Sequence, residues 1–159
     1  MTVAASDLDS DRTDRQRWMR VLALALPDRL EAAWDAVTDP PAVRTLRPPE
    51  IGTAMVTARA GGTGARFNLG EMTLTRCAVA IDGADGTTRV GHGHVAGRNR
   101  RHAELAAVFD ALLQDPAHQD RLERTLIAPL AAEQEAARHE TSRRAAASRV
   151  DFFTMVRGD

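Results

Sequence analysis

The stretch that decides the fold is MTLTRCAVAIDGADGTTRVGHGHV, residues Met72–Val95. Its two ends, Met72–Asp82 and Thr87–Val95, are rich in threonine, valine and isoleucine, which favour extended backbone. The residues between them, DGADG at Asp82–Gly86, are typical of a hairpin turn because glycine and aspartate tolerate positive φ. The stretch therefore predicts two antiparallel strands joined by a tight turn.

A third strand is predicted before this hairpin, over Ile51–Arg59. Within the middle strand the apolar pattern changes phase. Met72 and Leu74 share one parity, whereas the apolar residues from Cys77 onward share the other. We therefore expect a bulge or two-sided burial near Thr75.

Helices are predicted before and after the strands, from apolar residues spaced three and four apart. The expected segments are Arg15–Leu26, Asp28–Val37, Arg101–Gln114 and a shorter helix through Leu122 and Leu126. The segment Asp39–Pro49 contains four prolines and is expected to form a loop. Because the strands are grouped and do not alternate with helices, the sequence predicts an α+β fold: a small antiparallel sheet flanked by N-terminal and C-terminal helices.

The chain is expected to divide into three parts: a flexible acidic tail over residues 1–14, a single α+β domain over 15–130, and a helical arm with a partner-docking tail over 131–159. Residues 131–149 lack large apolar side chains but are rich in alanine, glutamate and arginine. These residue types favour helix. A long, solvated C-terminal helix is therefore predicted.

The tail that follows this arm, VDFFTMVRGD at Val150–Asp159, is apolar and extended in character. It could fold back on its own core or dock on another polypeptide. We favour the second, since such a segment is typical of extended recognition peptides. The candidate partner-binding residues are Val150, Phe152, Phe153, Met155 and Val156.

Composition excludes several chemistries. The 159 residues include 21 arginines, no lysine, no tyrosine and one cysteine, and the formal net charge is −1. Without lysine there is no P-loop lysine and no Schiff base, and the single Cys77 excludes an intrachain disulfide and a cysteine-rich zinc site. The four serines lie near the termini, so a serine nucleophile is not expected. No catalytic residue is assigned.

Charge and hydropathy also limit the partners and the location. The near-zero net charge argues against binding of nucleic acid, which needs a basic surface. The longest apolar run, Val21–Leu26, is too short for a membrane span, and the N-terminus does not have the pattern of a signal peptide. We therefore expect a cytoplasmic protein that binds no membrane.

Three motifs could carry chemistry. The cluster Gly61, Gly62, Thr63 and Gly64 with Arg66 could hold a phosphate through backbone N–H groups and a guanidinium, or could simply be a wide hairpin connection. The basic cluster Arg98–Arg101 could bind phosphate or an acidic surface, or could be a solvated turn. Both interpretations stay open for each motif.

The third motif is GHGH, Gly91–His94, which places His92 and His94 on one strand face. With His102 on the following helix they could ligate a metal, and a stand-alone metal-dependent enzyme is the alternative function. The other interpretation is two solvated or hydrogen-bonded histidines beside a tightly packed glycine face. The sequence does not determine where a third ligand lies, so no metal site is assigned.

Six segments together resemble the PhnG family of the bacterial carbon–phosphorus lyase core complex. They are RQRWMRVLA (Arg15–Ala23), GGTGARF (Gly61–Phe67), GEMTLTR (Gly70–Arg76), GRNRRHAE (Gly97–Glu104), LIAPL (Leu126–Leu130) and SRVDFFTMVRGD (Ser148–Asp159). The resemblance runs from about Arg15 to Asp159. Of the positions in these motifs, Arg66, Arg76 and His102 are candidates for substrate contact.

This resemblance implies an accessory, structural subunit. PhnG proteins assemble with PhnH, PhnI and PhnJ, two copies of each, and are needed with PhnH, PhnI and PhnL for methylphosphonate to displace adenine from MgATP. The product is alpha-D-ribose 1-methylphosphonate 5-triphosphate. The resemblance places the chemistry in PhnI and PhnJ and implies MgATP as a co-substrate of the complex, with no cofactor bound by this chain.

Overall fold

The computed structural model describes residues 5–147 and contains a three-stranded antiparallel sheet in the order β1–β2–β3. The strands are β1 (Val43–Arg59), β2 (Arg66–Asp82) and β3 (Thr88–Ala96). The helices are α1 (Ala5–Leu24), α2 (Pro27–Asp35), α3 (Arg100–Leu113), α4 (Pro116–Leu122) and α5 (Ala128–Ala147). A 3-10 turn at Ala60–Gly62 joins β1 to β2, and a π-helical turn at Glu123–Ile127 joins α4 to α5. The predicted α+β class is confirmed.

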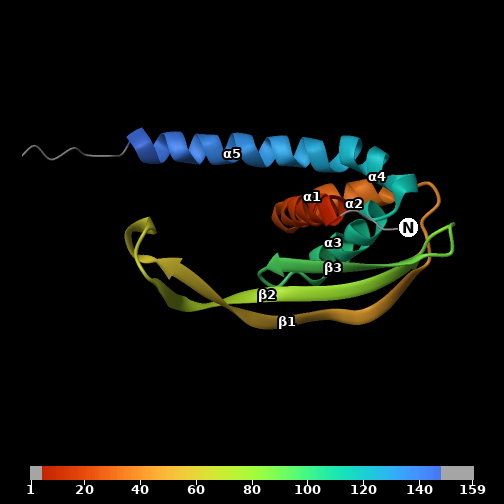
Figure 1. Ribbon diagram of the computed structural model, residues 1–159, viewed down its shortest axis with the longest axis horizontal. Helices are drawn as coiled ribbons and strands as arrows, with labels where there is room; N and C mark the ends of the chain where they lie inside the picture. Colours follow the sequence, from red (N-terminus) through yellow and green to blue (C-terminus); the bar gives the residue numbers. More distant parts are fainter. Residues whose placement is uncertain (1–4, 148–159) are drawn as a thin grey trace, which may run out of the picture.

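The helices stack over one face of the sheet (Figure 1). Helix α3 packs directly on β2 and β3, helices α1 and α2 pack on α3, and α5 contacts α1. The core lies between these layers, and the apolar stripe predicted on α3 is buried in it. The stripe consists of Leu105, Val108, Phe109 and Leu112. No described helix covers the opposite face of the sheet, which we call the open face (Figure 1).

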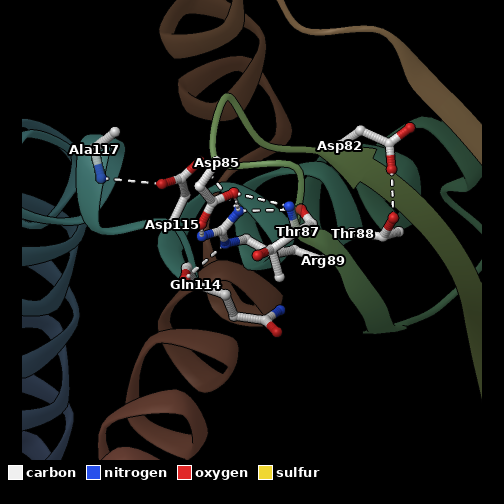
Figure 2. A network of polar contacts seen from close by, with 8 residues as sticks. All are labelled: Asp82, Asp85, Thr87, Thr88, Arg89, Gln114, Asp115 and Ala117. Carbon is white, nitrogen blue, oxygen red and sulfur yellow. Dashed lines mark hydrogen bonds and ion pairs between the residues drawn. The ribbon is translucent and has the colours of Figure 1, made fainter.

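The hairpin between β2 and β3 forms where it was predicted. The Gly83 N–H donates to the Thr87 carbonyl at 3.0 Å, and Gly86 has a φ of +75°. Arg89 then fastens the hairpin to the end of α3, because its Nε donates to the Gln114 carbonyl at 3.1 Å and its guanidinium pairs with Asp85 at 2.7 Å (Figure 2). This contact holds the sheet and the helical layer in one orientation.

Strand β1 begins at Val43, eight residues before the predicted start, so the expected loop over Asp39–Pro49 is wrong for its second half. Proline is tolerated here because β1 is an edge strand, and its register shifts between Thr45 and Arg47 and again between Arg47 and Glu50. The extra residues of these two shifts lie in β1 and not in β2 near Thr75 and Arg76, whereas a third shift, between Val56 and Thr57, adds one residue, Leu69, to β2. Strand β2 keeps an unbroken register with β3.

Helix α1 also differs, since it begins at Ala5 and not near Arg15. Residues 5–14, expected as part of an acidic tail, form its first half. Strand β2 likewise begins at Arg66, six residues before its predicted start. Strands β1 and β2 thus continue as a two-stranded ribbon beyond β3 and α3 (Figure 1).

Helix α5 matches the predicted arm. Its start is anchored by the buried Leu130, by Gln134 Nε2, which donates to the Val21 carbonyl at 2.9 Å, and by an Arg29–Glu133 ion pair at 2.7 Å. Residues 135–139 and 141–147 are exposed, and Glu140 is partly so. The apolar tail predicted to bind a partner lies outside the described residues.

Candidate functional site

The open face of the sheet carries a shallow hollow of about 390 Å³. All three strands contribute to it: the residues that line it are Leu46, Arg47, Arg76, Cys77, Ala78, His92 and His94. Residues 92 and 94 point here because alternate residues of a strand face opposite sides. Gly91 and Gly93 face α3 instead.

Two arginines of the hollow share one carboxylate. Glu50 accepts from Arg76 Nε at 2.6 Å and pairs with Arg47 Nη1 at 3.3 Å. His94 is the cross-strand partner of Arg76, and its ring lies 6.4 Å from that of His92 between centroids. Two guanidinium groups thus face one carboxylate, which leaves the hollow with a positive balance.

This positive balance acts on the pKa of His94. Burial lowers the pKa of His94 below its usual value of 6.5, and the neighbouring His92 and Arg76 lower it further. A neutral imidazole at this position can both donate and accept a hydrogen bond. Together with Arg47 and Arg76 it suits contact with an acidic group.

His102 lies elsewhere, so the three histidines of the alternative function do not come together. It is buried among the helices, and its Nε2 is 2.8 Å from the Leu22 carbonyl. No group of three or more histidine, cysteine, aspartate or glutamate side chains suited to a metal occurs among the residues that the structure describes. The alternative of a metal-dependent enzyme built on His92, His94 and His102 is therefore not supported.

The glycine cluster forms the far end of the ribbon. Gly61 has a φ of +59°, and the Gly64 N–H donates to the Ala60 carbonyl at 2.8 Å, so the wide-connection interpretation describes the local backbone. Arg66 is the cross-strand partner of Arg59. These two arginines, with Thr57 and Ala58, line a second depression of about 340 Å³. Phosphate contact by Gly61, Gly62, Thr63, Gly64 and Arg66 stays a prediction.

The candidate substrate-contact residues are thus spread over four places. Arg76 lies in the open-face hollow, the glycine cluster and Arg66 lie at the ribbon end, Arg98 is exposed on the loop before α3, and His102 is buried among the helices. Sequence reasoning missed Arg47, because it falls in the stretch expected as a proline-rich loop, and Glu50, because it lies between that loop and the predicted strand. The register shifts on either side of Arg47 also break the two-residue spacing that would have placed its side chain on the same face as those of later strand residues.

None of the helices in the part of the chain that the structure describes combines the length and the apolar character needed to cross a membrane.

Comparison of the sequence with known proteins identifies its family. The sequence profile described as "Phosphonate metabolism protein PhnG" matches residues 13–158. A similar protein from Rhizobium meliloti (strain 1021) is named "Alpha-D-ribose 1-methylphosphonate 5-triphosphate synthase subunit PhnG". It is 43% identical over 159 residues, which cover 100% of this chain and 99% of the relative. Because both the profile and the relative match over nearly the whole length, the chain belongs to the PhnG family of phosphonate metabolism proteins.

Proposed function

We propose that this chain is the PhnG subunit of an alpha-D-ribose 1-methylphosphonate 5-triphosphate synthase. The observation that carries the proposal is the 43% identity, over full length, to a relative with that name. The structure supports a role as a subunit, since an exposed helical arm and an exposed ribbon are features of a chain that functions bound to others.

The partners we propose are PhnH, PhnI and PhnJ in the core complex, with PhnL joining for the transfer step. In this complex methylphosphonate replaces the adenine of MgATP, and MgATP is a co-substrate that other subunits handle. The role of this chain is accessory and structural. The complex is expected in the cytoplasm.

The test is reconstitution. The full chain, carrying an affinity tag, is co-expressed with PhnH, PhnI and PhnJ, and adenine release from MgATP and methylphosphonate is measured after addition of PhnL. We expect the four chains to copurify and adenine release to require this chain. A monodisperse monomer that leaves PhnI unbound, or full adenine release without this chain, contradicts the proposal.

The phosphate-contact residues are tested in the same assay. If the glycine cluster holds the triphosphate, Arg66→Ala lowers adenine release while the complex still assembles. Arg98→Ala and Arg76→Ala are compared with it, because each lies in a different place on the molecule. Unchanged assembly and unchanged product formation in Arg66→Ala remove that residue from the site.

A further inference from the structure

We propose that the open face of the β1–β2 ribbon is the docking surface for another subunit of the complex, one that presents large apolar side chains beside a carboxylate. We call this surface the ribbon strip. It consists of Ala54, Val56, Ala58, Phe67, Met72 and Leu74. The inference rests on the proposed function, since it requires that the chain be a subunit.

The register of the ribbon separates an apolar side from a polar one. The cross-strand pairs Gly52↔Leu74, Ala54↔Met72, Val56↔Gly70 and Ala58↔Phe67 lie on one side and contain no polar side chain. The pairs between them, Thr53↔Thr73, Met55↔Glu71, Thr57↔Asn68 and Arg59↔Arg66, lie on the other side and are mostly polar. Paired residues share a face, and faces alternate along β1; in β2 a register shift opposite Val56 and Thr57 adds one residue, Leu69, so the face of Phe67 follows from its pairing with Ala58. Such alternation is the pattern of a strand with one buried face.

The described chain covers this side only in part, since Ala54, Val56, Ala58 and Leu74 are partly buried. Phe67 is 46% exposed and Met72 is 38% exposed, and the ribbon continues past β3 and α3 (Figure 1). A depression of about 290 Å³ lies beside the strip, lined by Val56, Leu69, Gly70, Glu71 and Met72. Contiguous exposed apolar surface of this kind marks interaction sites.

Charge selects the kind of partner. At the end nearest the core the strip meets the hollow, where Arg47 and Arg76 share the single carboxylate of Glu50. The Arg59↔Arg66 pair at the other end lies on the polar side of the ribbon and does not belong to the strip. Complementary charge favours a partner segment that carries an acidic side chain next to its apolar ones. A second copy of this chain fits less well, because it would bring arginines against arginines.

Two methionines provide a test without any mutation. Met72 lies on the strip and Met55 on the opposite side of the same ribbon, 38% and 52% exposed. Hydroxyl-radical footprinting of the wild-type chain, alone and in the copurified complex, reports the oxidation rate of each thioether. We expect assembly to slow the oxidation of Met72 and to leave that of Met55 unchanged. An unchanged Met72 rate in the complex overturns the inference.

Paired variants test the same surface by charge. Phe67→Asp with Met72→Asp alters the strip, and Ile51→Asp with Met55→Asp is the matched control on the other side. We expect the first pair to lower recovery of the partner subunits at least about tenfold, as loss of an interface centre does, and the second to retain it. Circular dichroism checks that both variants fold. Equal recovery by the two pairs contradicts the inference.

Other occupants give distinct results. If Met72 is already protected in the isolated chain and becomes reactive when residues 150–159 are removed, the chain's own tail covers the strip and the inference is wrong. If Met72 becomes protected when the isolated chain dimerises, a second copy of the chain covers the strip, and the inference is again wrong. If the wild-type chain recovers no partner subunits at all, the proposed function fails as well. Recovery without protection of Met72 overturns only the docking surface.

Discussion

At the scale of single residues, Asp110 ties three elements together. Its fully buried carboxylate accepts from Arg15 at 2.8 Å, from Trp18 Nε1 at 2.9 Å and from the backbone N–H of His92 at 2.8 Å. A buried charge is tolerated only when it is paired and hydrogen-bonded, as here. The contact to His92 also gives a hydrogen-bond acceptor to one backbone N–H of the edge strand β3, so α1 and α3 both contact this strand.

Replacing Asp110 should therefore be costly. Asp110→Ala removes the acceptor of the Trp18 Nε1–H and His92 N–H groups and leaves Arg15 without its carboxylate partner, and we expect a loss of about 3–5 kcal/mol in the free energy of unfolding. Urea unfolding followed by tryptophan fluorescence measures it. The control is Asp120→Ala at an exposed position of α4, expected within about 0.5 kcal/mol of wild type. Similar losses in both variants would contradict the assigned role.

His94 gives a prediction in pH. Because burial, His92 and Arg76 all disfavour its charged form, its pKa lies below 6.5 in the folded chain. The unfolded chain then binds more protons, so the contribution of this group to stability is present above 6.5 and declines as the pH falls below that value. An NMR titration of the imidazole should show the low midpoint. Arg76→Ala should raise it, while Arg121→Ala on α4 should leave it in place; a midpoint insensitive to Arg76 contradicts the electrostatic account.

At the scale of elements, the fit of α3 on β3 depends on glycine. A Cβ added to Gly91 would lie 1.9 Å from the Ala107 carbonyl oxygen, and one added to Gly93 would lie 1.9 Å from that of Ala103. Both distances are far inside van der Waals contact and involve backbone atoms, so the helix would have to move. The alternation GHGH thus places small residues against the helix and histidines on the open face.

Gly93→Ala should consequently destabilise the fold by about 1–3 kcal/mol through overpacking. Gly52→Ala is the matched control, since a Cβ there would meet no atom within 4 Å. Thermal or urea denaturation of the two variants measures the difference in their stability. Were Gly93→Ala as stable as Gly52→Ala, the close approach of α3 to β3 would not be a feature of the folded chain.

Some elements were predicted correctly from the sequence and others were not. The β2–β3 hairpin and the stripe on α3 were predicted correctly, because turn residues and apolar spacing act locally. The first part of β1 was missed because Pro48 and Pro49 indicate a loop unless the strand is known to lie at a sheet edge. Asp110 was missed for a related reason: an acidic residue on a helix has the same pattern whether water or three donors surround it.

At the scale of the whole molecule, two parts project from one core: the ribbon of β1 and β2, and the helix α5 (Figure 1). Beyond Gln134, α5 is held by its own ion pairs, such as Arg144 with Glu140 at 2.9 Å. Such exposed pairs contribute little to stability. The core and the arm should therefore respond to mutation independently.

Ala137→Pro tests this independence. Proline interrupts the helix there, so the circular dichroism signal at 222 nm should fall. The unfolding transition of the core, followed through Trp18 and Trp34, should keep its midpoint. Leu130→Ala at the buried start of the same helix should instead lower the free energy of unfolding by about 2–5 kcal/mol. A common loss in both variants indicates that the arm belongs to the core.

The sequence by itself determined the class of fold, the hairpin at Asp82–Gly86, the helical character of the arm and the family, because turn chemistry, apolar period and residue identity are local properties. Only the tertiary structure decided which side chains meet. It separated His102 from His92 and His94, joined Arg47 to Arg76 through Glu50, and placed an apolar side of the ribbon beyond the reach of the described helices. These outcomes depend on strand register and on layer packing, which bring together residues far apart in the chain and leave no pattern at any one position.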